Sequence, residues 1–480
     1  MKEPSGLTLV LLLLSAGFFL ASGQRIYAFD GDWSVQATNS FEYYHLKENL
    51  AFRFLPQEAK EDSIRNRLIV DFLLGDFYAG VWYELAPPGV FGSSSFKEEA
   101  KLKQRYFGWH QNGLEIRGGH FNATFDRGLV LNAFFDDFAN ISRNIDGIKV
   151  HYTSDLLNSE VVGGEIFDEF SGDSLSIRGG RAALTPFGLF SIGGAYLRLW
   201  ERSILGRMKS TNVKQGNWGL SFGPVDLYGE YAQQGGYLSA LLPVEGDGTY
   251  LSGSFYGPFF GVTAEYKNYI HMQIPGVNSP PAVNHLEKSL NGGWNEIGWR
   301  LAATLTPYGD WSLEVDWANS WTRGTGNIFD EQFVEVRGSY YRDNVLRASY
   351  DRHKEQDHLE HWSDFTIYYY LTRRSTVSVG GLHKKYEDTF DKDYYEGDLT
   401  VGFSHSNFFS INLTGGRNSR PAQIRELPEK TASVELTIKF RNNDLTVFHG
   451  DQRGGLVCSS GVCTFQPAFR GTKVLLLSRF

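Results

Sequence analysis

Residues 433–440 read SVELTIKF, and this octapeptide carries the pattern that decides the fold. Val434, Leu436, Ile438 and Phe440 are apolar, and each is preceded by a polar or charged residue. Because successive side chains of a strand point to opposite faces, the pattern predicts a strand with one apolar and one polar face. The same alternation recurs at 225–231, 296–305, 312–317, 333–341 and 398–403. The chain is therefore predicted to be all-β.

The connections between these strands alternate between short and long from about residue 173 onward. Short turns are predicted near 186–188, 223–224, 257–258, 308–310, 342–344, 373–375, 406–407 and 442–444. Longer polar connections are predicted at 202–215, 236–247, 270–293, 322–329, 356–361, 388–394, 418–429 and 451–470. This alternation is typical of outer-membrane β-barrels, in which short turns face the periplasm and long loops face outward.

The two ends of the chain fit an exported protein. An apolar run at 7–21 follows Met1 and Lys2, and small residues follow it, which predicts a secretory signal peptide over 1–28, cleaved after 23 or 28. The run is shorter than the ~20 residues of a membrane-spanning helix. Residues 29–480 are then expected to form the barrel, with 451–470 as the last extracellular loop and 471–480 as the closing strand. The terminal Phe480 is the expected assembly signal, typical of substrates of the barrel-assembly machinery.

Composition agrees with a membrane barrel. Aromatic residues make up 15% of the 480 residues, with 25 Tyr, 36 Phe and 11 Trp, as expected where rings gird a barrel at both membrane interfaces. The mean hydropathy of −0.31 does not contradict this, because only alternate residues of a strand face lipid. The net charge of −9 is spread along the chain without a basic cluster, which argues against nucleic-acid binding.

The strand count is predicted from the whole chain. In the first third, strands are expected at 32–44, 66–76, 76–86, 111–121, 145–154 and 159–168, with a weaker one near 129–135. The total is about 20–24 antiparallel strands in a single-chain transmembrane barrel, with an even number. A barrel of this width encloses a wide lumen unless something fills it. The candidates for inward-folded loops are 87–104, 122–144 and 270–293.

The order of several motifs resembles a family of bacterial outer-membrane barrel proteins of unknown function. These motifs are RNRLIVDFLLGDFYAGVWYE from residue 65, KQRYFG from 103, GLEIRGGHFNATFDRGLVLNAFFDD from 113, IDGIKVHY from 145, and a C-terminal Cys…Cys pair followed by PAFRG…SRF. The resemblance covers most of the chain after the predicted signal peptide. It implies a barrel in the bacterial outer membrane, and it supplies no catalytic residues.

Alternation also assigns charged side chains to the lumen, where the selectivity of a channel resides. The lumen-lining candidates are Asp226, Glu230, Arg300, Glu314, Asp316, Glu335, Arg337, Arg347, Asp398, Glu435 and Lys439. One interpretation is cross-strand salt bridging that stiffens the wall, and the other is a transverse field from opposed acidic and basic ladders. The first is favoured, although the sequence leaves both open.

The Gly-rich stretch 118–132 allows two interpretations. Arg117, His120, Asp126 and Arg127 could form a lumen constriction. Alternatively, the stretch is a tight periplasmic hairpin in which Gly128 supplies a positive φ, and this second interpretation is favoured.

The remaining chemistry-bearing residues lie in predicted extracellular loops. Cys458 and Cys463, the only two cysteines, are predicted to form a disulfide in the oxidising exported environment. His353, His358 and His361 lie among acidic residues and are weak candidates for a metal site, against the favoured interpretation of a solvated loop. No cofactor and no catalytic residue are predicted.

The function expected is a porin-like outer-membrane channel for the passive or selective passage of small solutes. The alternative is a scaffold barrel that houses or docks a partner, such as a cytochrome conduit or a secretion component, and an outer-membrane hydrolase is least favoured. The expected partners are outer-membrane lipid, the barrel-assembly machinery, small solutes and a periplasmic or extracellular protein.

Overall fold

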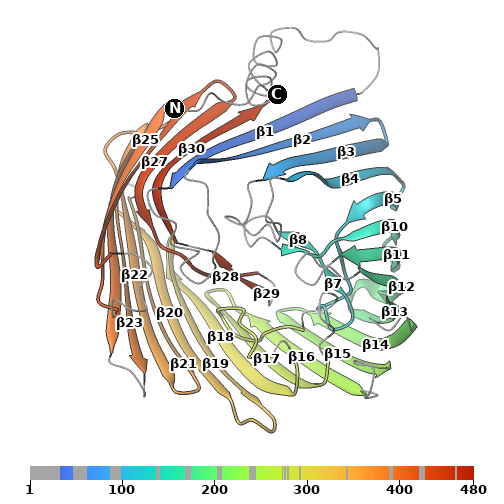
Figure 1. Ribbon diagram of the computed structural model, residues 1–480. Helices are drawn as coiled ribbons and strands as arrows, with labels where there is room; N and C mark the ends of the chain where they lie inside the picture. Colours follow the sequence, from blue (N-terminus) through green and yellow to red (C-terminus); the bar gives the residue numbers. More distant parts are fainter. Residues whose placement is uncertain are drawn as a thin grey trace.

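A closed ring of strands forms the body of the protein (Figure 1). The computed structural model describes residues 33–46, 62–86, 99–136, 141–167, 174–202, 208–236, 245–272, 274, 277, 280–290, 293–341, 344–388, 393–420, 428–459, 462–466 and 468–480. The ring consists of 24 antiparallel strands, which confirms the predicted all-β barrel with an even strand number. Within the described residues, no helix is long and apolar enough to cross a membrane.

The strands of the ring follow chain order. They are β1 (Trp33–Leu46), β2 (Asp62–Leu74), β3 (Phe77–Ala86), β4 (Glu99–Gln111), β5 (Leu114–Phe121), β10 (Ile145–Thr153), β11 (Leu157–Phe167), β12 (Ser174–Leu184), β13 (Phe190–Arg202), β14 (Met208–Phe222), β15 (Val225–Gly236), β16 (Gly246–Tyr256), β17 (Phe260–Ile270), β18 (Glu296–Tyr308), β19 (Trp311–Thr322), β20 (Ile328–Tyr340), β21 (Asn344–Glu355), β22 (His358–Tyr370), β23 (Ser375–Asp388), β24 (Tyr394–His405), β25 (Phe409–Asn418), β26 (Lys430–Phe440), β27 (Asn443–Gln452) and β30 (Phe469–Arg479).

In the described part of the chain, six short strands lie outside the ring sheet. They are β6 (Ala123–Thr124), β7 (Asn132–Ala133), β8 (Phe135–Asp136), β9 (Ile141–Ser142), β28 (Gly455–Ser459) and β29 (Val462–Gln466), and they pair as β6–β7, β8–β9 and β28–β29. The ring itself closes where β30 pairs with β1. At this seam the Phe480 amide donates to the Ala37 carbonyl at 2.8 Å, and the Ala37 amide donates to the Phe480 carbonyl at 3.2 Å.

Seven of the eight predicted short turns are present in the described residues, and the eighth falls on residues 342–343, which lie outside them. Other predictions need correction. Residues 99–104, expected in an inward loop, belong to β4, whose alternate Lys101 and Lys103 hide its strand character; residues 87–98 lie outside the described part. The connection expected at 356–361 is only the two-residue turn 356–357, because its charged residues pair across β21 and β22. The weak strand near 129–135 supplies only β7 and part of β8, not a ring strand.

Two segments fold into the ring, as predicted for 122–144 and 270–293. The first begins at the end of β5 and turns tightly, with the Phe125 amide bonded to the Leu131 carbonyl at 2.9 Å. The second connects β17 to β18, and its Val277 carbonyl accepts the Asn132 amide of the first at 2.8 Å. Figure 1 shows β7 and β8 inside the ring. We call the described residues between β5 and β10 (122–136 and 141–144) the first luminal segment. The described residues between β17 and β18 (271, 272, 274, 277, 280–290 and 293–295) are the second luminal segment.

The first luminal segment buries an apolar core against the inner wall. Phe125, Leu129, Val130 and Leu131 are each 0% exposed. The cluster that they join includes wall residues from β10 to β17: Ile145, Val162, Ile166, Ile177, Ala195, Leu197, Leu199, Val213, Ala232, Tyr250 and Tyr269. Full burial of such a side chain stabilises a fold by about 1.5–3 kcal/mol. The first luminal segment therefore shields this apolar part of the inner wall from water.

The outer face of the ring carries large apolar side chains. Val161 on β11 is 60% exposed, whereas its neighbour Val162 is 2% exposed and lies under the first luminal segment. Exposed aromatic residues gather beside the short turns: Phe187, Phe222, Phe259, Tyr308, Tyr341 and Phe408. A broad apolar surface with aromatic residues at one rim is the surface that a lipid bilayer covers.

Candidate functional site

The tip of the first luminal segment is held by polar groups of the wall. The Asp126 carboxylate accepts hydrogen bonds from the Gln215 amide at 2.6 Å and the Asn217 amide at 2.7 Å. Arg181 approaches the same carboxylate at 3.5 Å. Hydrogen bonds to a carboxylate are roughly twice as strong as bonds between neutral groups. This tip is therefore fixed to β12 and β14.

The interpretation of 118–132 as a periplasmic hairpin is wrong. Gly128 has φ +89°, as a turn requires, but the turn lies inside the ring. The reason is that the chain leaves β5 at the end opposite its two-residue turn with β4, and the apolar residues 129–131 draw it into the lumen. Arg117 stays on β5, stacked over Tyr106 at 4.1 Å. The proposed constriction of Arg117, His120, Asp126 and Arg127 is therefore not assembled.

Several predicted lumen residues hold these segments or pair across strands. The Arg127 amide donates to the Glu230 carboxylate at 3.3 Å. Arg300 pairs with Asp316, at 2.6 Å from Nε to Oδ2, and with Glu265 at 3.1 Å. These contacts support the salt-bridging interpretation of the lumen charges.

The other predicted residues have neighbours of opposite charge and neighbours of like charge. Arg347 pairs with Glu335 at 2.8 Å and with Asp364 at 3.4 Å. Arg337 stands opposite Arg347 in the register of β20 and β21, and Glu314 stands opposite Glu335. The remaining positions are as follows: Glu435 accepts a hydrogen bond from Asn412 at 3.3 Å, Lys439 stands opposite Asp444, and Asp226 stands opposite Ser221 and Ser254.

A charged network on β1 to β4 escaped the sequence analysis. Glu42 accepts from Arg67 at 2.9 Å, and Arg65 pairs with Glu84 at 2.6 Å. Lys103 lies 3.7 Å from Glu84. The signal available was the pair of alternating basic motifs RNR at 65–67 and KLK at 101–103, which place their charges on one face of each strand.

The second luminal segment is anchored at several points. Glu331 of β20 accepts the His285 amide at 2.7 Å and the Leu286 amide at 3.1 Å. Lys288 forms a salt bridge with Glu355. Tyr269 donates to the Pro281 carbonyl at 3.2 Å. The segment is thus tied to β17, β20 and β21.

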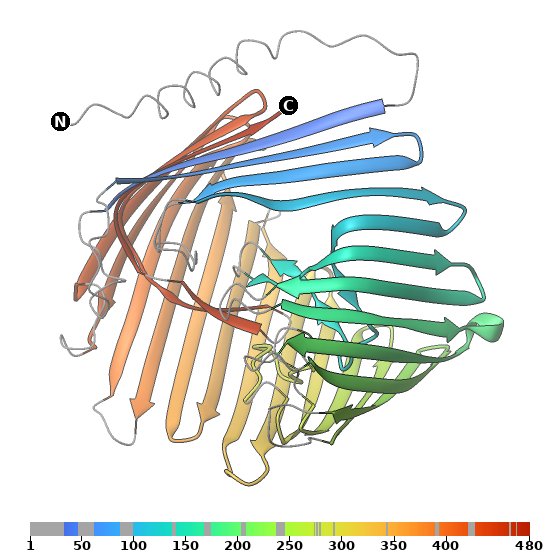
Figure 2. The ribbon, with the colours of Figure 1, turned by 45° about the vertical axis from the view of Figure 1, so that its right-hand side comes forward.

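The connection between β27 and β30 also turns toward the lumen. Arg453 reaches β24, where it pairs with Glu396 and Asp398, each at 3.1 Å. In both views the β28–β29 hairpin lies within the outline of the ring (Figures 1 and 2). Cys458 and Cys463 stand opposite one another in this hairpin. Their side chains lie outside the described part, so the disulfide remains a prediction, which thiol labelling before and after reduction tests.

The three histidines of 353–361 do not form one metal site. His353 lies on the inner face, with Nδ1 3.3 Å from Asp351 and Nε2 3.4 Å from Glu360. His361 stands opposite Arg352, one position away, and its ring bonds to the Tyr350 hydroxyl at 2.8 Å. Because adjacent positions of a strand face opposite sides, the wall separates His353 from His361. His358 begins β22 opposite Glu355.

The class of protein follows from these features: a closed 24-stranded antiparallel barrel with inward-folded segments, similar in fold to bacterial outer-membrane barrel proteins. Residues 4–291 match the model of a family of unknown function (DUF6029), and the chain belongs to this family. No curated protein matches the sequence.

Solved structures share the fold at low sequence identity. A chain of the E. coli P pilus tip assembly intermediate PapC-PapD-PapK-PapG has a TM-score of 0.56 and 12% identity, over 95% of this chain and 62% of that chain. The P pilus usher (PapC) translocation pore has a TM-score of 0.47 and 11% identity, over 93% and 99%. The siderophore receptor PirA from Pseudomonas aeruginosa has a TM-score of 0.49 and 8% identity, over 93% and 80%. At these identities the likeness concerns the fold alone.

Proposed function

We propose that this protein is an outer-membrane transport barrel that passes small polar solutes along the charged side of its lumen. Its outward apolar and aromatic surface supports a position in the bilayer, with the short turns in the periplasm and the long connections outside. Outer-membrane lipid is then its solvent, and the barrel-assembly machinery inserts it after the signal peptide is removed.

The observation that carries the proposal is the division of the inner wall into two unlike parts. From β10 to β17 the inner face carries the apolar cluster that the luminal segments cover, together with polar groups such as Gln215, Asn217 and Glu230 that hold the first segment. From β18 through β30 to β4 the inner residues include the charged groups of the Arg300, Arg347, Arg453 and Arg67 pairs. Polar solutes cross where polar groups replace their hydration, so this second part is the route.

Positively and negatively charged side chains lie close together along this route. Arg453 meets two carboxylates on β24, and Arg67 meets Glu42 on β1. Mixed charge of this kind favours solutes that are polar but carry little net charge, because such solutes satisfy both donors and acceptors without meeting a field of one sign. Sugars and zwitterions are the solute classes that we infer.

A second candidate is a barrel that docks a protein partner. The filling of the lumen by the luminal segments and the β28–β29 hairpin favours it, since a filled lumen leaves the rims as the working surfaces. In this case solutes would not pass through the barrel, and a periplasmic or extracellular protein would copurify with it after crosslinking in cells.

Liposome swelling with the purified barrel tests the first candidate against the second. Liposomes that hold the barrel should swell in isotonic sugars and zwitterionic amino acids at rates that fall with solute size. The control is the same lipid with heat-denatured barrel. Absence of swelling from barrel whose gel mobility shows it to be folded would contradict the transport function.

A further inference from the structure

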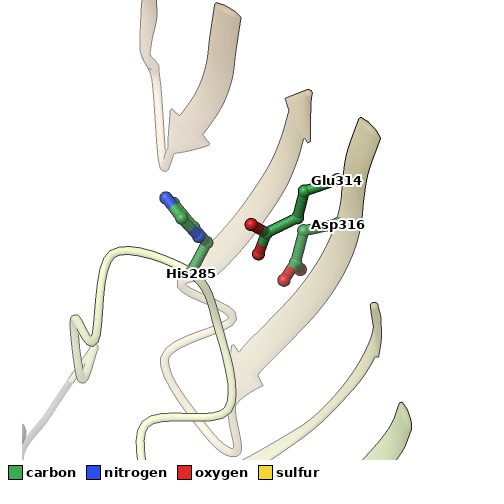
Figure 3. A group of neighbouring side chains, drawn as sticks. All are labelled: His285, Glu314 and Asp316. Carbon is green, nitrogen blue, oxygen red and sulfur yellow. The ribbon is translucent and has the colours of Figure 1, made fainter. Parts of the chain in front are cut away.

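Three side chains from two different elements meet at the inner wall without binding one another. His285 lies on the second luminal segment, whereas Glu314 and Asp316 lie on β19. One ligand atom from each lies within 4.8 Å of the others. Figure 3 shows both carboxylates extending from the strand toward the loop that carries His285. Among the described residues, no hydrogen bond or ion pair joins the imidazole to either carboxylate.

Each of the three groups has an unused ligand atom. The Asp316 side chain is 0% exposed, and its Oδ2 binds Arg300, but its Oδ1 is buried without a hydrogen-bond partner. A buried carboxylate oxygen left without a hydrogen-bond partner destabilises the fold. Within the described part of the chain, no basic group pairs with Glu314, whose cross-strand neighbour Glu335 carries the same charge.

The nearby cations are already committed to other carboxylates. Arg300 is shared between Asp316 and Glu265, and Arg347 pairs with Glu335 and Asp364. A partly buried site with this excess of carboxylates is stabilised by a cation that the chain itself does not supply.

The position of His285 suits a metal ligand. Its amide is held by Glu331, and its ring stacks on Phe333 with the centroids 3.6 Å apart and the planes at 15°. Stacking fixes the plane of the ring and leaves its nitrogen edges open. These two contacts orient the imidazole before any metal binds.

We propose that His285, Glu314 and Asp316 bind one divalent first-row transition metal ion, with Zn²⁺ as the best match. One imidazole nitrogen and two carboxylate oxygens form a borderline donor set, and Zn²⁺ takes both kinds at about 2.0–2.2 Å. On binding, the Glu314 and Asp316 side chains would rotate to bring the ligand atoms, which now lie within 4.8 Å of one another, to that range. Three protein ligands leave a fourth position open to water or to a polar group of a solute.

The ion would fasten the second luminal segment to β19. The segment already contacts β17, β20 and β21, and the metal would add a link to β19. The site does not depend on the proposed transport function. A barrel that conducts nothing could still bind the ion, and a conducting barrel that does not bind it would overturn only this inference.

Isothermal titration of the EDTA-treated barrel in nanodiscs with ZnCl₂ tests the site. Wild type is expected to bind one Zn²⁺ per barrel. Loss of an outer-shell partner already weakens a metal by about 10–100-fold, so loss of a ligand in His285→Ala or Glu314→Gln should weaken it by at least about 100-fold. His361→Ala, on the outer face, should bind as wild type does. Each variant must keep its heat-modifiable gel mobility.

Two results would overturn the proposal. One is the absence of stoichiometric Zn²⁺ binding to folded wild type. The other is binding that survives both His285→Ala and Glu314→Gln. X-ray absorption at the zinc edge adds an independent readout, since the site predicts one nitrogen ligand together with oxygen ligands, and a shell of oxygen alone would contradict it.

Discussion

Lys267 of β17 and Glu296 of β18 form a salt bridge in which the two side chains are 0% and 1% exposed. The ammonium also donates to the Ala282 carbonyl of the second luminal segment. Glu296 is the first residue after that segment and Lys267 lies four residues before it, so the pair closes the base of the loop. A buried pair of this kind orders the chain only while both partners are present.

Lys267→Met should therefore destabilise the barrel by about 3–5 kcal/mol, because it leaves the Glu296 carboxylate buried without its cation. The measurement is the unfolding free energy in urea of barrel refolded into liposomes. The matched control is the double variant Lys267→Met with Glu296→Leu, which should recover much of the loss. A single variant as stable as wild type would show that the pair does not hold the loop.

Asp126→Ala should loosen the tip of the first luminal segment. It removes the acceptor of the Gln215 and Asn217 amides and leaves them unpaired, at about 1–3 kcal/mol. Amide hydrogen exchange at residues 129–131 should then be faster by about tenfold to a hundredfold. Asp310→Ala, at an exposed turn, should leave exchange at 129–131 unchanged. Equal exchange in both variants would contradict the anchoring role.

Arg67→Gln should make the lumen prefer cations. It removes one positive charge from the β1–β4 network, while Glu42 keeps Lys473 at 4.0 Å and Glu84 keeps Arg65 at 2.6 Å, so the fold should persist. The reversal potential in a salt gradient is expected to shift toward that of the cation. Arg373→Gln, at a short turn outside the lumen, should leave it unchanged. An unchanged reversal potential would place this network outside the conducting route.

Phe480→Ala should reduce assembly more than it reduces the stability of assembled barrel. The variant retains both backbone hydrogen bonds between residue 480 and Ala37 but loses the aromatic ring that is predicted to be the assembly signal. The amount of heat-modifiable barrel in outer-membrane fractions should fall severalfold. Barrel that does assemble should unfold in urea as wild type does. Normal amounts of the variant in the membrane would show that the Phe480 side chain is not part of the assembly signal.

The sequence predicted the ring well because alternation is a local property. It failed at β4, where Lys101 and Lys103 take alternate positions and leave little apolar signal. It also missed the apolar cluster on the inner face from β11 to β14. At Val161 and Val162 both faces of the strand are apolar, so the sequence pattern does not distinguish the inner face from the outer one. Only the packing of residues 129–131 shows which face is covered.

The sequence placed two residues of the candidate metal site in the lumen but did not predict the site. Glu314 and Asp316 were assigned to the lumen by alternation, because they occupy alternate positions of one strand. His285 was missed because it belongs to an irregular segment, and only tertiary packing brings it to β19. Conversely, His353 and His361 are close in sequence, but the two-residue turn between β21 and β22 places them on opposite faces. Proximity in sequence misleads where strand register decides orientation.

The register of β5 and β10 offers a direct test of the partly filled lumen. Phe121 stands opposite Ile145, so a short Gly-rich hairpin could replace residues 122–144 without changing the pairing of the two strands. Gel mobility before and after heating would establish that the shortened barrel is folded, although it exposes apolar wall residues such as Ile177 and Leu197.

Single-channel conductance in planar bilayers, measured for wild type and for this shortened barrel, tests the central claim most directly. The account predicts stable openings of wild type along the charged wall and larger unit steps when the first luminal segment is absent. Silence from both folded proteins would contradict transport and would favour the partner-docking barrel.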